Sequence, residues 1–251
     1  MLLDVDTSGR EKKDIIMRSS GIGAALVAIA TGVPAFAGSM TTFDSAISAG
    51  VVIGSGIPNG NFVVNTNTDN GVQTGIKAIE RFVGDLANTG NRYAARAGES
   101  PVSGAANAPA DPGMATWNYL YSVDLGTSGL TFADVSVHVE IDFDPAVGNS
   151  NVFEFELVSS LAAQSIDISG MTLFQDSQNL GFAFWQGIGD PDIQAFDPFA
   201  RGEYTMSVEV VQNSNGEVLS GVDMVVAVVP LPGAAGMGLA GLALVGVRRR
   251  R

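Results

Sequence analysis

The sequence contains no cysteine and a single histidine, His138. Without cysteine, the chain forms no disulfide framework, no thiolate metal site and no cysteine nucleophile. Ser136 and Glu140 flank His138 at alternate positions. Neighbours along one strand face stand about 6 to 7 Å apart, which is too far for a Ser-His-acid triad to meet at one point. We therefore interpret His138 as a surface residue.

Basic residues are also scarce, because 13 Lys and Arg stand against 26 Asp and Glu and give a formal net charge of -13. Between residues 38 and 229 the imbalance is greater: five basic residues face 22 acidic ones, a formal charge of -17. Such a surface repels DNA, RNA and anionic membrane faces. We exclude nucleic acid as a partner and expect an anionic polysaccharide to be contacted only through bridging divalent cations.

The first apolar stretch has the layout of a secretory signal. A short basic segment (MRSS, 17–20) precedes an apolar run (21–31), and Ala35-Phe36-Ala37 forms a small-x-small cleavage site before Gly38. We predict a signal peptide over 17–37, handled by the Sec translocon and signal peptidase. Residues 1–16 mix four acids with three bases, which is unusual at this position, so we expect an unstructured extension with the true start at Met17.

The other end is a proline-broken apolar tail. Val229-Pro230-Leu231-Pro232 leads into an apolar segment (233–247), and the chain closes on Arg248, Arg249, Arg250 and Arg251. The prolines block both a β-ladder and the α conformation just before them, so residues 230–251 are separated from the body. As a helix the apolar segment spans about 22 Å, short of a ~30 Å hydrocarbon core. We expect transient insertion, with the arginines in the cytoplasm.

This tail resembles the PEP-CTERM sorting signal in its Val-Pro-Leu-Pro variant. The resemblance implies a Gram-negative protein that passes through the inner membrane and is cleaved by an exosortase. Its expected destination is the outer surface or the exopolysaccharide matrix, and the resemblance implies no reaction. The alternative is a plain tail anchor.

Between the two ends, period-two alternation predicts β-strands. Val135, Val137, Val139 and Ile141 share one face of a strand whose other face is polar. Further strands are expected at 117–124, 152–158, 171–174, 181–186, 203–211 and 217–229, with a hairpin at 213–216. The stretch 72–86 fits a strand or a helix, and we favour the strand because Gly75 and Gly84 disfavour a long helix. A Pro/Gly-rich stretch, 98–113, is expected to be a loop. The prediction is a single antiparallel, jelly-roll-like β-sandwich over 38–229.

One strand carries the sharpest candidate for chemistry. Glu140, Asp142 and Asp144 alternate along it, and close carboxylates shift each other's pKa. The segment resembles the Glu-Ile-Asp-x-x-Glu strand of laminarinase-like β-glucanases. That resemblance implies Glu140 as nucleophile, Asp142 as its modulator and Asp144 as acid/base. Here the third residue is one methylene shorter and precedes Pro145. A solvent-exposed strand face running into a turn is the simpler interpretation, and we predict no enzyme.

Aspartates also cluster in Pro-containing turns. Asp142, Asp144, Asp190 and Asp192 are candidate Ca²⁺ ligands, because calcium takes six to eight oxygens. Local turn capping by each Asp is the favoured alternative, and no cofactor is expected. Two aromatic groups, at 117–121 and 182–185, fit core packing better than sugar stacking. We predict an exported, non-enzymatic surface or matrix protein, with a carbohydrate-binding module or glucanase as the alternative.

Overall fold

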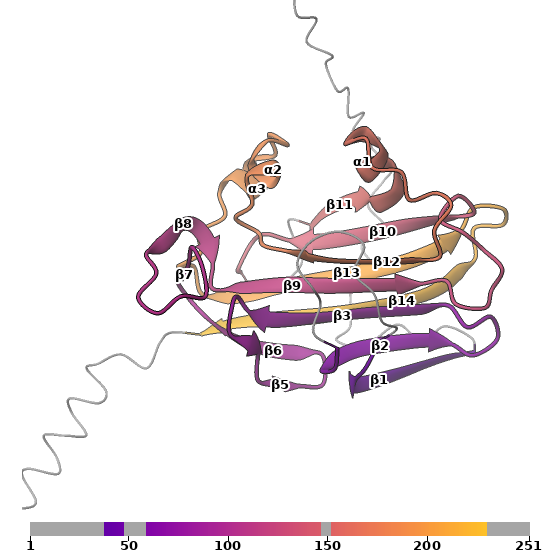
Figure 1. The fold of residues 1–251 in the computed structure, drawn as a ribbon, viewed down its shortest axis with the longest axis horizontal. Helices are drawn as coiled ribbons and strands as arrows, with labels where there is room; N and C mark the ends of the chain where they lie inside the picture. Colours follow the sequence, from indigo (N-terminus) through magenta and orange to yellow (C-terminus); the bar gives the residue numbers. More distant parts are fainter. Residues whose placement is uncertain (1–37, 48–58, 147–151, 230–251) are drawn as a thin grey trace, which may run out of the picture. The chain divides into compact units, whose positions relative to one another are not determined.

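The structure, a computed structural model, describes residues 38–47, 59–146 and 152–229. In these ranges the chain forms two six-stranded sheets and a separate hairpin (Figure 1). The predicted all-β antiparallel sandwich is confirmed. The predicted signal segment before Gly38 and the predicted sorting segment after Val229 lie outside the described residues.

The first sheet, sheet A, is antiparallel throughout. Its strand order is β1 (Ser39–Ser45), β2 (Phe62–Asn67), β3 (Gln73–Glu80), β9 (Trp117–Asp124) and β12 (Leu173–Gln178), with β4 (Gly84–Asp85) paired to β3. The strand expected in 72–86 is therefore present as β3 and β4. The expected strand at 171–174 is present as β12, which begins at Leu173 and continues to Gln178.

The second sheet, sheet B, contains one parallel pair among its described strands, β14 with β6. Its order is β11 (Val152–Glu156), β10 (Val135–Asp142), β13 (Gly202–Gln212), β14 (Val218–Val229), β6 (Arg92–Arg96) and β5 (Asn88–Thr89). The hairpin predicted at 213–216 joins β13 to β14. It closes with a 2.8 Å bond from the Gln212 amide to the Glu217 carbonyl, and Gly216 takes the left-handed conformation at a φ of 73°.

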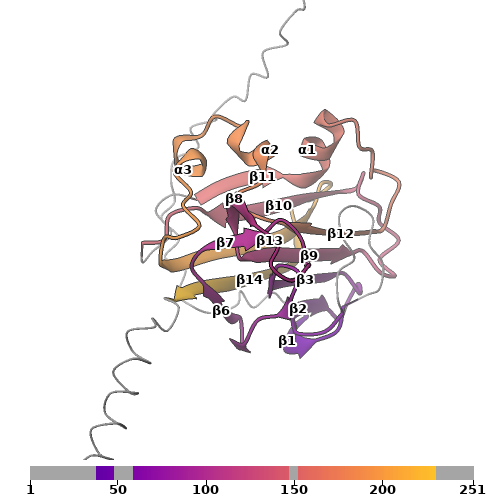
Figure 2. The same cartoon turned by 60° about the vertical axis from the view of Figure 1, so that its left-hand side comes forward.

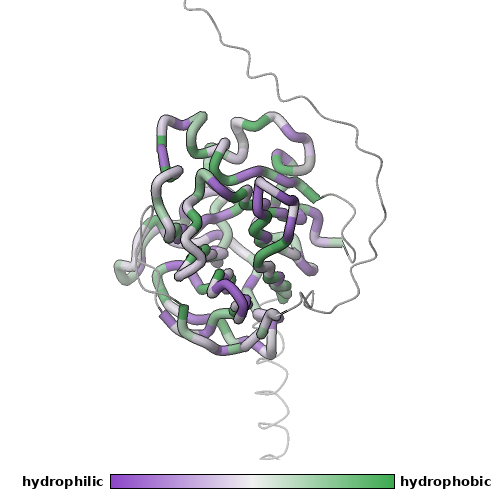
Figure 3. Tube along the Cα trace, turned by 90° about the vertical axis from the view of Figure 1, so that its right-hand side faces the viewer, coloured by the Kyte–Doolittle hydropathy of each residue, from purple (hydrophilic) through white to green (hydrophobic). Residues whose placement is uncertain are grey.

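The core lies between the two sheets, as expected from the alternation. Apolar and polar residues interleave along the strands (Figure 3). In β10 the apolar members are buried and the intervening residues are partly exposed until Ile141, and β13 follows the same pattern. Buried residues from both sheets, such as Ile76, Tyr121, Val139 and Val208, form one continuous cluster. Burial of alternate side chains on each sheet thus stabilises the sandwich.

The outer face of sheet A is covered as well. Phe62, Val64 and Leu120 form a second apolar cluster with Ile47, which follows β1. Lys77 is fully buried in this layer, where its Nζ donates to the Asp85 carboxylate at 2.8 Å and to the Gly60 carbonyl at 2.9 Å. The ammonium retains a hydrogen-bonded counter-charge, which is the condition for burying a lysine.

Short helices replace part of the expected strand content. The strand expected at 152–158 ends at Glu156, whose carboxylate accepts from the Val158 and Ser159 amides and begins α1 (Leu157–Ala163). The strand expected at 181–186 was wrong, because α2 (Ala183–Gln186) forms there, followed by α3 (Pro191–Gln194). These helices gather beyond the β11 edge (Figures 1 and 2). None of the helices in the described ranges is long and apolar enough to cross a membrane.

The stretch 98–113 is more ordered than a loop. β7 (Glu99–Pro101) pairs with β8 (Ala110–Ala115) as a hairpin. Arg81 holds both strands, because its guanidinium donates to Ser100 Oγ at 2.7 Å and to the Asp111 carboxylate at 2.9 Å. The loop prediction was wrong here because these contacts come from residues distant in sequence.

Candidate functional site

The candidate site is a pocket of about 240 Å³ on the outer face of sheet B. It is lined by His138, Glu140, Glu154, Ser207 and Glu209. Three carboxylates, one hydroxyl and the chain's single imidazole therefore share one small surface region.

Strand register explains why these residues meet. In β10, polar residues alternate with buried valines, so His138 and Glu140 point outward. Antiparallel pairing then places Glu154 of β11 opposite Glu140, while Ser207 of β13 lies opposite Glu140 on the other side. The same ladder places Glu209 opposite His138. The pocket is thus assembled from three neighbouring strands.

Two side-chain contacts give the pocket its internal order. His138 Nδ1 lies 2.7 Å from Glu154 Oε1, and this pair is ionic when the imidazole is protonated. Ser207 Oγ donates to Glu140 Oε2 at 3.1 Å. Each carboxylate contact therefore links β10 to a different neighbour, β11 in one case and β13 in the other.

Glu209 has the most perturbed electrostatics in the pocket. Partial burial raises its pKa above the usual glutamate value; the nearby His138 lowers it, and the Glu140 and Glu154 charges raise it again. The raised pKa means that Glu209 holds a proton more readily than an exposed glutamate. The carboxylate oxygens of the pocket can accept hydrogen bonds from a polar molecule.

The three carboxylates of the glucanase-like strand do not line one pocket. Glu140 faces the pocket, but Asp142 is buried and its Oδ1 accepts from the Asp144 amide at 2.9 Å. Asp144 Oδ1 in turn accepts from the Ala146 amide at 2.9 Å. Burial is the main cause that raises the pKa of the Tyr204 phenol. The charges of Asp197, Asp144 and Asp142 raise it further. Asp142 and Asp144 thus stabilise consecutive turns after β10.

The candidate calcium ligands are also separated into local structures. Asp142 and Asp144 lie at the end of β10, whereas Asp190 and Asp192 flank Pro191 at the start of α3. The Asp192 side chain lies outside the described residues. Across 38–47, 59–146 and 152–229, no three His, Cys, Asp or Glu side chains form a group that could hold a metal ion.

Two residues of the predicted sorting signals, Gly38 and Val229, lie at the margins of the sandwich. Gly38 precedes β1, and its carbonyl accepts from the Thr68 amide at 2.7 Å. Val229 ends β14. The remaining ones lie outside the described residues: Ala35 and Ala37 at the signal cleavage site, Pro230, Leu231 and Pro232 of the sorting motif, and Arg248, Arg249, Arg250 and Arg251.

The two aromatic groups are used mainly in packing. Trp117, Tyr119 and Tyr121 are almost fully buried. Trp185 is also buried, with its ring centroid 5.4 Å from that of Phe155 and 4.4 Å from that of Phe184. Phe184 itself is 43% exposed.

Sequence reasoning missed Glu154, Ser207 and Glu209 as members of a site. Alternation shows that Ser207 and Glu209 share one face of their strand, and the same holds for Glu154 in the following strand. The missing information is which strands pair and in which register. That information was not contained in the local pattern.

Comparisons with known proteins give little further information. No family model matches the sequence, and no curated protein matches it. Among solved structures, the chain is similar to the soluble domain of PmoD from Methylocystis sp. (Rockwell), with 11% identity, coverage of 62% of this chain and 91% of that chain, and a TM-score of 0.29. A likeness this low carries no argument about fold or function.

Proposed function

We propose that this chain is an exported, non-enzymatic protein of the cell surface or the exopolysaccharide matrix. In this proposal, residues 17–37 direct export through the Sec translocon. Residues 230–251 form a PEP-CTERM-like tail that inserts briefly into the inner membrane and is removed by an exosortase.

The main support is the position of the tail relative to the last strand. β14 runs from Val218 to Val229 and pairs with β6 through Val229. Its inward residues, including Val226 and Val228, belong to the core. Pro230 and Pro232 follow at once, and neither can donate to a ladder. A processing enzyme can therefore remove residues beyond the prolines and leave every described strand of the sandwich intact.

The other end supports the same division. β1 begins at Ser39, two residues after the predicted cleavage position at Ala37. Met40, Thr41 and Thr42 pair with β2. Removal of residues 1–37 therefore leaves the described strands intact.

The surface chemistry agrees with an extracellular matrix role. Four of the five basic residues between 38 and 229 are paired with acids: Lys77 with Asp85, Arg81 with Asp111, Arg92 with Glu203 and Arg96 with Glu80. The excess of carboxylates keeps the protein hydrated, and its contact with an anionic polymer depends on bridging cations.

Intact-mass measurement tests the proposal. The chain is produced in a Gram-negative host that carries an exosortase and in the same host with the exosortase deleted. We expect the first host to release a product lacking the signal peptide and the four C-terminal arginines, and the second to retain the tail in the membrane fraction. Pro230→Ala combined with Pro232→Ala should block release, whereas Pro109→Ala, at an exposed body position, should not.

Two results contradict the proposal. A product from both hosts that still ends in four arginines excludes processing. Hydrolysis of a β-glucan by the purified protein that disappears in Glu140→Gln excludes the non-enzymatic role.

A further inference from the structure

Exposed apolar side chains gather at one end of the sandwich. Nine large hydrophobic residues are exposed in the described ranges. Five of them surround the β7–β8 hairpin and the end of β14, and we call them the apolar end: Phe82, Val83, Val102, Phe199 and Val229. Their exposed fractions run from 46% to 74%. Exposed apolar groups that cluster in this way mark a contact surface.

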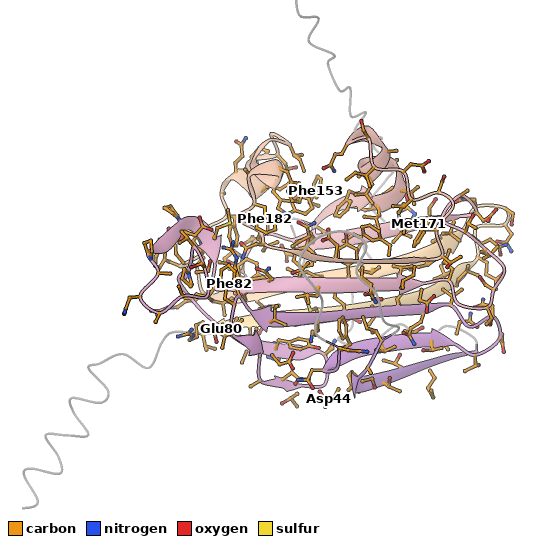
Figure 4. The ribbon with its side chains drawn as sticks, in the orientation of Figure 1. Asp44, Glu80, Phe82, Phe153, Met171 and Phe182 are labelled. Atoms are coloured by element: carbon orange, nitrogen blue, oxygen red, sulfur yellow. The ribbon has the colours of Figure 1, made fainter. Side chains whose placement is uncertain are left out.

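Backbone hydrogen bonds show that these residues are neighbours. The chain of contacts is Val229 carbonyl to Ala97 amide (3.2 Å), Gly98 amide to Pro198 carbonyl (2.7 Å), Gly98 carbonyl to Thr116 amide (3.1 Å) and Thr116 carbonyl to Arg81 amide (2.8 Å). A Cβ at Gly98 would lie 3.9 Å from the Phe199 ring, and one at Gly104 would lie 3.4 Å from Phe82. β7, β8 and the end of β14 lie at the same side in Figure 1, and Phe82 is labelled there in Figure 4.

The apolar tail leaves the sandwich at this end. Val229 is the last described residue, and the apolar segment begins at Gly233. A fully extended chain advances by at most about 3.3 to 3.6 Å per residue, so Gly233 lies within about 15 Å of Val229. When the tail enters a bilayer, the apolar end is therefore held beside the membrane surface.

Arginines lie among the exposed apolar groups at this end, and two of them already pair with carboxylates, Arg81 with Asp111 and Arg96 with Glu80. Arg81, Arg96 and Arg201 lie here and make up three of the five basic residues between 38 and 229. The Arg81 guanidinium lies over the Phe82 ring, 4.8 Å from its centroid. Arg96 has a side chain that is 52% exposed, and Arg201 is an exposed residue two positions after Phe199. Apolar groups beside arginines are typical of surfaces that lie at a membrane interface.

We propose that the apolar end is a lipid-contacting surface that rests in the headgroup region of the bilayer while the tail is inserted. The inference rests on the proposed sorting function, since the tail provides the attachment. The partner is the bilayer itself. In this arrangement Phe82, Val102 and Phe199 reach the boundary between headgroups and acyl chains, and the exposed Arg201 meets a lipid phosphate. The sandwich then presents its tail junction, Val229-Pro230, directly at the membrane surface.

Single-cysteine labelling tests this inference, because the chain contains no native cysteine. The chain from Gly38 to Arg251, without the predicted signal peptide, is inserted into vesicles of phosphatidylethanolamine and phosphatidylglycerol with a fluorophore at Val102→Cys or Phe199→Cys. Met40→Cys is the matched control, because Met40 is 55% exposed but lies at the opposite end. Met40 pairs with Thr66 of β2. Asn67, the residue after Thr66, donates its side-chain amide to the Leu219 carbonyl, so Met40 lies near the start of β14 and away from Val229 at its end. Leu242→Cys reports insertion of the tail.

We expect spin-labelled lipids to quench the fluorophore at positions 102, 199 and 242 several-fold more than at position 40. Quenching at 242 with positions 102 and 199 no different from 40 overturns the inference and leaves the sorting proposal standing. No quenching at 242 overturns the sorting proposal and this inference with it. Shielding at 102 and 199 that rises with protein concentration without lipid quenching indicates a second copy as partner, and overturns it also. Thermal unfolding of each variant checks that the sandwich is intact.

Discussion

The two sheets differ in how many of their faces are buried. In sheet A, both faces of the central strands are covered: β9 is buried at every position from Trp117 to Val123. In sheet B, the inner face is buried, while the outer face carries the pocket around His138 and several partly exposed carboxylates. Sheet A thus holds an additional apolar layer, and sheet B presents the acidic surface.

The difference shows where each kind of residue is tolerated. A covered face demands a partner for every polar group, and Lys77 meets that demand through Asp85 and the Gly60 carbonyl. An open face allows Glu140, Glu154 and Glu209 to lie close together, because water screens their repulsion. Three substitutions test whether the two faces differ as described.

The largest effect is expected from Leu120→Ala on the outer face of sheet A. Leu120 is fully buried in the cluster with Phe62 and Val64. We expect a loss of about 2 to 5 kcal/mol in the free energy of unfolding, because truncation removes buried methyl groups and leaves a cavity. Urea unfolding measures it. Val225→Ala, at a half-buried outward position of sheet B, is the matched control and should cost less than half as much. Equal losses would mean that the two outer faces are equally buried.

An intermediate effect, this time a gain in the free energy of unfolding, is expected from Asp176→Asn in β12. Asp176 is 3% exposed and pairs with Tyr121 in the ladder. Burial raises its pKa from 3.8 to about 6, while bonds from the Ser177 amide and Gln178 lower it. The pKa of Asp176 is higher in the folded chain than in the unfolded chain. The contribution of protonated Asp176 to the stability of the wild-type fold is therefore fully present below about pH 4 and is lost as pH rises through about 6. The variant should be more stable at pH 7 by up to about 2 to 3 kcal/mol.

Urea unfolding of wild type and Asp176→Asn at pH 7 and pH 4 checks this. The gap between the two proteins should shrink at the lower pH. Asp134→Asn is a control that should lower stability at pH 7 instead of raising it. The reason is that the Thr131 amide and hydroxyl lower the pKa of the exposed Asp134. A gap for Asp176→Asn that is unchanged between the two pH values would show that its carboxylate is not desolvated in the fold.

The smallest effect is expected from Glu209→Gln in the open pocket. Burial raises the Glu209 pKa, His138 lowers it, and Glu140 and Glu154 raise it, with a net increase. The contribution of protonated Glu209 to the stability of the fold is therefore present at low pH and is lost as pH rises through the raised pKa of Glu209. The variant should gain well under about 1 kcal/mol at pH 7, since solvent screens the site. Thermal unfolding at pH 4 and pH 7 measures this gain in stability. Glu217→Gln, at an exposed position in the hairpin region, is measured in parallel as the control. A loss of stability at pH 7 would contradict this account.

Regular strands were predictable in both sheets. In sheet B, the exposed face produces a period-two pattern, so β10, β13 and β14 were predicted closely from the sequence. In sheet A, the apolar run at 117–124 predicted β9 with the same bounds, although β9 has no exposed face. Residues 182–185 include three aromatics and also fit a strand. The chain turns just before them, at Asn179. The Asn179 side chain accepts from the Gly181 amide at 2.9 Å and donates to the Trp117 carbonyl at 2.8 Å. α2 follows this turn, and no local pattern indicates it.

The candidate site was predictable only in part. Glu140 was correctly placed on an outward strand face, because alternation alone decides that. Its neighbours in the pocket come from β11 and β13, and their positions depend on register. Asp142 and Asp144 share the alternation of Glu140, but Asp142 accepts a backbone bond and Pro145 follows, so the strand ends and the pattern no longer holds.

The sequence by itself determined the class of fold, the strands with one exposed face and the acidity of the surface, because periodicity and charge are local properties that survive any arrangement of the strands. Tertiary structure alone decided which carboxylates surround His138, how Lys77 is buried and which exposed apolar residues gather beside Val229. These features depend on contacts between residues up to 150 or so positions apart, such as Asn67 with Leu219, and contacts of that range leave no periodic trace along the chain.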